Sequence, residues 1–100
     1  MPTPRIFVPH TELASLCERY HVRRLSLFGS VLRDDFGPDS DIDMLVEFED
    51  DHIPGLAFFS LQDELSHLFG RTVDLNTAGF LSPYFRDDVI ATSSVLYVAA

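Results

Sequence analysis

The chain contains no lysine, and its seven basic residues, all arginines, face sixteen acidic residues. The formal net charge of −9 repels nucleic acid at long range, and no basic stripe that could neutralise phosphates is visible. Without lysine, Schiff-base chemistry is excluded, and contacts to phosphate must come from arginine or from the backbone. We therefore expect no direct nucleic-acid partner, and a basic protein surface suits this charge better.

Cysteine and long apolar runs are also scarce. Cys17 is the single cysteine, which excludes an internal disulfide, and no Cys/His cluster with zinc spacing occurs. No run approaches the roughly 18 apolar residues of a membrane helix, and the N-terminus lacks the apolar core of a signal peptide. We expect no membrane association and a cytoplasmic location. With 46% hydrophobic residues, the chain can build a real core, and we expect one domain over residues 1–100.

Apolar periodicity predicts helices and strands that alternate along the chain in the order α-β-α-β-α-β-α-β. The expected elements are a helix near 11–20, a strand at 25–28, a short helix from Ser30, a strand at 41–48, a helix at 56–69 ending before Gly70, a strand at 72–75, a helix capped by Ser82 and a strand at 95–98. This alternation favours an α/β (α+β) fold with a central sheet flanked by helices. Neither the strand order nor the strand directions follow from the pattern alone.

Two carboxylates in the strand at 41–48 indicate chemistry rather than folding. Because side chains alternate along a strand, Asp41 and Asp43 share a face, about 6.6 Å apart along it, and can close on a common cation. Two unit charges about 4 Å apart cost on the order of 4 kcal/mol at an effective dielectric of about 20. Such a site should bind metal or raise a carboxylate pKa. Mg²⁺ is the natural occupant, since it prefers hard oxygen ligands.

A third carboxylate, Asp74, lies in the next predicted strand. Val73 and Leu75 share one face of that strand and point to the core, so Asp74 occupies the other face. A neighbouring strand would then present Asp74 beside Asp41 and Asp43. Three such carboxylates predict a two-metal clamp that holds the attacking and leaving oxygens of an in-line displacement.

Gly29 and Ser30 predict a phosphate site before these carboxylates. Gly29 lacks the Cβ that would keep a phosphate off the backbone, and Ser30 opens the short helix, whose free amides could face the β- and γ-phosphates of a nucleotide. Arg33 could reach a phosphate from one turn further on, although a solvent-exposed arginine is an equally good interpretation.

The pattern of Gly29 and Ser30, ten residues, then Asp41 and Asp43 resembles the minimal nucleotidyltransferase domains of the DNA polymerase beta superfamily. The resemblance covers nearly the whole chain, because Asp74 matches the later strand carboxylate and residues 82–97 resemble the usual C-terminal helix and strand. It implies the nucleotidyltransferase fold, with a central mixed sheet flanked by helices. The loop at 37–40 is also similar, which implies a nucleotide contact for Ser40 beside those of Gly29, Ser30 and Arg33. Where many relatives have a glycine after the arginine, this chain has Asp34 and Asp35.

Small members of that family resemble the antitoxin of a two-gene system that includes an all-helical HEPN ribonuclease toxin. The resemblance implies transfer of AMP from ATP to a toxin tyrosine, with release of pyrophosphate. Asp41 and Asp43 would hold both Mg²⁺ ions, and Asp74 would act on one of them and could help to deprotonate the acceptor hydroxyl.

Two alternatives remain open. The chain could be a non-catalytic antitoxin that neutralises a partner by binding, although occlusion would not need three converging carboxylates. It could also be a nucleotidyltransferase for small molecules, whose acceptor pocket a homodimer could build. Several phenylalanines could signal an exposed interface, although core packing is the default interpretation. They are Phe58, Phe59, Phe80 and Phe85.

Overall fold

A four-stranded mixed sheet forms the centre of the protein in a computed structural model that describes residues 6–33, 36–37, 39–52 and 54–100, with only the backbone at residue 80. Its strands are β1 (Val22–Phe28), β2 (Ile42–Phe48), β3 (Val73–Asn76) and β4 (Ser94–Val98), in the order β3-β2-β1-β4. β1 runs antiparallel to β2 and β4, whereas β2 and β3 are parallel. The predicted mixed sheet and α/β class are confirmed.

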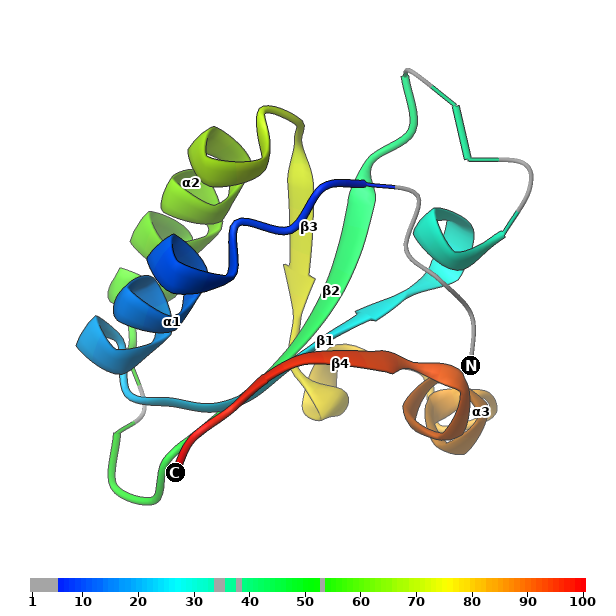
Figure 1. The fold of residues 1–100 in the computed structure, drawn as a ribbon. Helices are drawn as coiled ribbons and strands as arrows, with labels where there is room; N and C mark the ends of the chain where they lie inside the picture. The colour runs from blue at the N-terminus through cyan, green and yellow to red at the C-terminus, as the bar shows by residue number, and fades with distance from the viewer. Residues whose placement is uncertain (1–5, 34–35, 38, 53) are drawn as a thin grey trace.

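Two helices, α1 (His10–Arg19) and α2 (Ala57–Phe69), cover one face of this sheet (Figure 1). The core lies between these helices and the sheet. It consists of the apolar residues that alternate along β1 and β2, such as Leu25, Leu27 and Met44, packed against Leu61 and other helix residues. Cys17 also lies in this core, and burial raises the pKa of its thiol to about 12, so it is an inert packing residue.

Helix α2 also fixes β3, which lies at the edge of the sheet. The Val73 amide donates a hydrogen bond to Ser66 Oγ at 2.9 Å, and the Leu75 amide donates to Gln62 Oε1 at 3.0 Å. An edge strand normally presents unpaired N–H groups. Here the α2 side chains satisfy two of them and hold β3 at one position along the sheet.

Within the described ranges, no layer covers the opposite face of the sheet, which is flanked by α3 (Arg86–Thr92) and by the 3₁₀ helix η2 (Ala78–Phe80) (Figure 1). Helix α3 contains no buried residue. The side chains on this open face of β2 are Asp43, Leu45 and Glu47, because Ile42, Met44 and Val46 point into the core. The open face is therefore the side on which chemistry can take place.

Several element boundaries differ from those predicted. β1 begins at Val22 rather than at residue 25, because a bulge between Val22 and Arg24 hides the alternation. The last helix begins at Arg86, since the Ser82 carbonyl accepts the amides of Phe85 and Arg86 in a separate turn. The helix at Ser30 is a single 3₁₀ turn, η1 (Gly29–Leu32).

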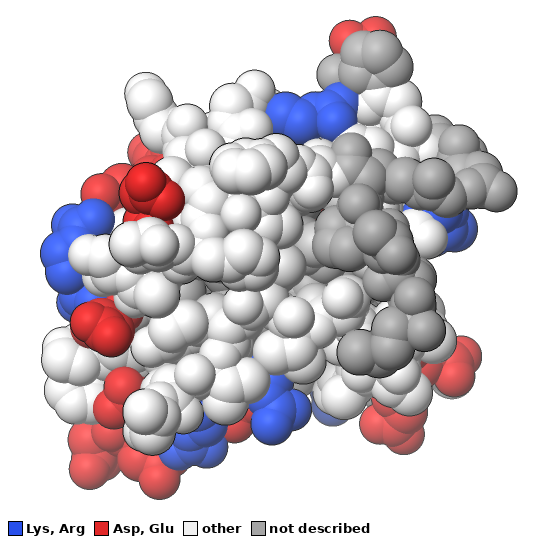
Figure 2. Space-filling view, in the orientation of Figure 1, with Lys and Arg blue, Asp and Glu red and all other residues white. Residues whose placement is uncertain are grey.

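Charged side chains on the face shown in Figure 2 gather toward its margins, around a broad uncharged area. The arginines there form separate patches rather than a continuous band. None of the described helices has the length and apolar character that a bilayer crossing requires.

Candidate active site

Asp43 and Asp74 lie directly beside each other in the register of the parallel strands β2 and β3. Their chain neighbours Ile42, Met44 and Val73 are buried on the helix side, so both carboxylates point to the open face. Neighbouring strands are about 4.8 Å apart, which brings the two acids within reach of one ion. The placement of Asp74 beside Asp43 is that expected from the sequence.

Asp41 lies just outside the sheet, because β2 begins at Ile42 rather than at Asp41. The Ile42 amide donates a hydrogen bond to the Thr72 carbonyl at 2.9 Å. This bond joins the first residue of β2 to the residue that precedes β3. Asp41 is exposed at this point. Asp41 is therefore the exposed residue before β2, two residues before Asp43.

The pKa of Asp43 is raised above its ordinary value. Burial of the carboxyl is the largest cause, followed by the negative charges of Asp74 and Asp41, while the positive charge of Arg33 lowers it. The charges of Asp74, Asp41 and Arg33 therefore all act on the Asp43 carboxyl. A carboxylate that is repelled in this way gains from a bound cation.

Gly29 lies against the Asp43 carboxylate. Phe28 is opposite Asp43 in the register of β1 and β2, and the following Gly29 has φ +75°, a conformation that favours glycine. A Cβ at this position would overlap Asp43 Oδ2 and lie 3.3 Å from Asp43 Cγ. The sequence assigned the missing Cβ to phosphate access, and in the structure the missing Cβ also makes room for the Asp43 carboxylate.

Ser30 follows in η1, and its carbonyl accepts the Arg33 amide at 2.9 Å. Arg33 has an extended backbone and an exposed side chain. The single 3₁₀ turn of four residues offers fewer aligned amides than the helix N-terminus of a nucleotide-binding α-helix. Any phosphate contact here would therefore depend on the side chains of Ser30 and Arg33 as well as on the backbone.

Ser40 closes the loop that leads to Asp41. Its Oγ accepts the Gly37 amide at 3.0 Å, and its own amide donates to the Gly37 carbonyl at 3.1 Å. The Ser40 hydroxyl proton can still be donated to a ligand. Asp34, Asp35 and Pro38, which also belong to this loop region, lie outside the described residues.

Arg71 is a residue that the sequence reasoning missed. Its guanidinium donates a hydrogen bond to the Gly37 carbonyl and lies 4.3 Å from the centroid of the Phe36 ring. Arg71 follows Gly70, the left-handed residue that ends α2. In the sequence, the signal that could have identified Arg71 is its place directly after this glycine and just before the strand that carries Asp74. Arg71 anchors the loop before Asp41 to the base of β3.

Replacing Arg71 by methionine should loosen this loop. A net hydrogen bond contributes about 1 kcal/mol, so amide exchange at Gly37 and Ser40 should become roughly fivefold faster. Hydrogen exchange measured by NMR checks this. Arg19→Met, which removes an exposed arginine paired with Glu64 at 3.1 Å, is the matched control and should leave both amides unchanged. Equal exchange rates in Arg71→Met and the parent chain would show that the contact does not hold the loop.

The donor chemistry of this site is all oxygen. Mg²⁺ is usually held by one or two carboxylates and completes its shell with water and substrate phosphates, which suits Asp43, Asp74 and the adjacent Asp41. Within the described part of the chain, no three His, Cys, Asp or Glu side chains are grouped closely enough to hold a metal ion among themselves. The raised pKa of Asp43 is the feature that favours a cation here.

The chain is similar in sequence to a known domain family and to known proteins. The family described as "Nucleotidyltransferase domain" matches residues 13–94. A Methanocaldococcus jannaschii protein, named as a candidate protein adenylyltransferase, is 42% identical over 77 residues, which are 74% of this chain and 76% of that protein. The protein adenylyltransferase MntA of Thermococcus cleftensis is 46% identical over 61 residues, 60% of each chain.

Solved structures show the same fold. A structure described as a minimal nucleotidyltransferase has a TM-score of 0.66 and 34% identity, and the match covers 84% of this chain and 83% of that one. The MNT antitoxin complex with a tri-AMPylated Shewanella oneidensis HEPN toxin gives a TM-score of 0.63 at 22% identity, covering 90% of this chain and 70% of that one. At this lower identity the likeness is one of fold.

Proposed function

The chain belongs to the nucleotidyltransferase domain family and is a nucleotidyltransferase, and from this premise we propose that it is a Mg²⁺-dependent protein adenylyltransferase that acts as an antitoxin. In this proposal it transfers AMP from ATP to a tyrosine hydroxyl of a HEPN-type toxin in the cytoplasm. The observation that carries the proposal is the register pair of Asp43 and Asp74 on the open face, with Gly29 packed against Asp43.

The acceptor hydroxyl oxygen would attack the α-phosphorus of ATP. A new bond forms between that oxygen and the α-phosphorus, the bond to the bridging oxygen of the β-phosphate breaks, and pyrophosphate leaves with the electron pair. The hydroxyl proton would pass to the exposed carboxylate of Asp74, which acts as the base. Atoms and charge balance without any further reactant.

Asp41, Asp43 and Asp74 would hold the metal, with two Mg²⁺ ions as the proposed number. Because the three carboxylates are not grouped closely enough to hold an ion among themselves, phosphate oxygens of ATP and water would supply the remaining ligands. Bound Mg²⁺ supplies positive charge that stabilises the developing charge on the phosphate oxygens. Gly29 keeps Asp43 in position, Ser30 and Arg33 would contact the β- and γ-phosphates, and the hydroxyl proton of Ser40 would be donated to the nucleotide. Arg71 would act indirectly, by holding the loop that carries Ser40.

A protein acceptor is supported by three observations. The two relatives described above carry names of protein adenylyltransferases, and one of the structural neighbours is a complex of an antitoxin with an AMPylated HEPN toxin. The net charge of −9 favours a basic protein over a nucleic acid.

The direct test is the intact mass of the product of the adjacent gene after incubation with this protein and Mg²⁺-ATP. We expect a mass increase of one adenylate for each modified hydroxyl, and peptide mapping should place it on tyrosine. EDTA should prevent the increase. An unchanged mass with a stable complex would indicate neutralisation by binding, and an unchanged mass without a complex would indicate a small-molecule acceptor.

Mg²⁺-ATP should also stabilise the folded chain. At a concentration ten times the dissociation constant, binding adds about 1.4 kcal/mol to the free energy of unfolding. For a domain of this size, that raises the thermal midpoint by about 5 to 10 °C. Thermal denaturation with ATP and EDTA is the control, because a site built from carboxylates should bind the triphosphate poorly without metal. A midpoint that Mg²⁺-ATP leaves unchanged would contradict the nucleotide site.

A further inference from the structure

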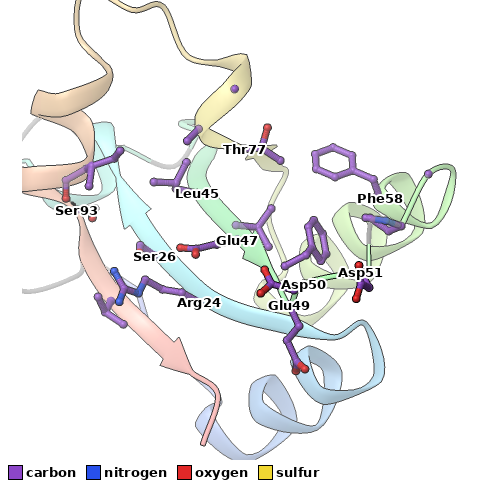
Figure 3. Close-up of a pocket in the computed structure, with 18 of the residues that line it drawn as sticks. Arg24, Ser26, Leu45, Glu47, Glu49, Asp50, Asp51, Phe58, Thr77 and Ser93 are labelled. Carbon is purple, nitrogen blue, oxygen red and sulfur yellow. Dashed lines mark hydrogen bonds between the residues drawn. The ribbon is translucent and has the colours of Figure 1, made fainter.

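A groove of about 890 Å³ lies on the open face of the sheet (Figure 3). Arg24 and Ser26 of β1 and Leu45 and Glu47 of β2 line its floor. Phe58 of α2 and Ser93, which follows α3, line opposite sides. None of these side chains belongs to the proposed catalytic set.

The groove begins one step along the sheet from the catalytic pair. Leu45 is the next residue after Asp43 on the open face, about 6.6 Å further along β2, and its register partner in β3 is Asn76. Thr77, which follows Asn76, already lines the groove. A chain segment lying in the groove could therefore present a side chain directly to Asp43 and Asp74.

Apolar side chains are exposed along this groove. Phe59 is 60% exposed and Ile90 is 44% exposed, and Val95 of the edge strand β4 is similarly accessible. Ile90 lies on α3, which contains no buried residue of its own. Exposed apolar side chains that line one concave surface are typical of an interaction site rather than of free surface.

The rim of the same groove is acidic. Glu49, Asp50 and Asp51 line it and add to the charge of Glu47 on the floor, whereas Arg24 contributes one positive charge to the lining. Arg23 compensates part of this charge, because it pairs with Glu47 at 3.0 Å and with Asp50 at 2.8 Å. The remaining charge is negative, which disfavours a nucleotide triphosphate in the groove and favours a cationic occupant.

From these features we propose that the groove binds the acceptor segment of the partner protein, a segment with apolar side chains flanked by lysine or arginine. Its apolar side chains would pack on Leu45, Phe59 and Ile90, its basic residues would face Glu49 and Asp51, and its hydroxyl would reach Asp43 and Asp74. This assignment rests on the proposed function and specifies the substrate surface of the same site. Nucleotide and acceptor then approach the carboxylates from different sides.

The experiment measures binding separately from chemistry. Phe59→Asp and Glu49→Lys are compared with the parent chain in titrations with the product of the adjacent gene, without ATP. Each should weaken the complex at least tenfold and raise the KM for that acceptor, while the KM for ATP stays within twofold. Phe7→Asp is the control, because Phe7 is 84% exposed and does not line the groove. It should change neither quantity by more than twofold.

The outcomes separate this inference from the proposed function. A complex that forms equally well with the parent chain and with both groove variants would overturn the inference, even if AMP transfer is observed. Absence of a complex with the parent chain would also overturn it. A complex that depends on Phe59 and Glu49 but shows no gain in mass would support the groove and contradict the proposed AMP transfer.

Discussion

Replacing Asp43 by asparagine is expected to lower the rate of AMP transfer by a factor on the order of 10³ or more, while the fold persists. Asp43 is adjacent to Asp74 in register and is affected by the charges of Asp41, Asp74 and Arg33. The asparagine side chain has nearly the same size but carries no charge to hold a metal ion. Steady-state transfer assays with circular dichroism of the same samples measure both effects.

The same substitution should raise stability in the absence of Mg²⁺. Folding raises the pKa of Asp43, through burial first and then through Asp74 and Asp41, so the charged form destabilises the folded state. The stability associated with protonated Asp43 is fully present below the unfolded pKa and is lost as pH rises through the folded pKa. The Asp43→Asn chain should therefore be more stable than the parent at neutral pH, and the difference should vanish in acid.

Thermal midpoints measured from neutral pH into acid check this sign. Asp63→Asn, which alters an exposed carboxylate on α2, is the control for a general change in net charge. If Asp43→Asn were less stable than the parent at neutral pH in EDTA, the carboxylate would have a supporting contact that outweighs the repulsion. That result would remove the main physical argument for a cation at this site.

Replacing Gly29 by alanine should cause the second large loss, about 10²-fold or more in kcat/KM, because a displacement of about 1 Å in a catalytic group can have that effect. The added Cβ would overlap Asp43 Oδ2, so the carboxylate must move away from its position beside Asp74. The backbone at φ +75° adds strain on the order of 1 to 2 kcal/mol for any L-residue. Activity and the free energy of unfolding should both fall.

Gly55→Ala is a matched control for this prediction. Gly55 has φ +58°, so alanine there carries similar backbone strain, but a Cβ would meet no atom within 4 Å beyond its chain neighbours. The two variants should lose similar stability from the backbone, and only Gly29→Ala should lose Mg²⁺-ATP binding. Gly55 lines the groove proposed for the acceptor, so the two variants are compared by their affinity for Mg²⁺-ATP and not by transfer. Equal losses of Mg²⁺-ATP binding in both would show that strain, rather than contact with Asp43, explains the need for glycine.

The sequence predicted the sheet and the carboxylate pair because both depend on local alternation. Asp43 and Asp74 are each flanked by apolar residues that must face the core, so their own direction follows directly. The start of β1 was missed because a bulge interrupts this alternation near Arg24. The sequence predicts Ser82 as the cap of the last helix, but a serine hydroxyl suits a helix cap and a turn equally well, and the structure has the turn.

Contacts between distant segments could not be predicted in this way. The hydrogen bond of Arg71 to the Gly37 carbonyl joins residues on two different connections, and nothing in either segment indicates the other. The groove likewise depends on how α3 is placed relative to the sheet. The closeness of Gly29 to Asp43 follows only from the register of β1 against β2.

The hydrogen bonds from β3 to Ser66 and Gln62 have a consequence for the reliability of assembly. If β3 slipped by one residue along β2, its side chains would exchange faces, so Asp74 would enter the core while Val73 and Leu75 faced water. Both the helix contacts and the apolar packing oppose that error. A molecule in which β3 pairs with β2 in the wrong register should therefore be unstable. Almost every folded molecule should then have Asp74 paired with Asp43.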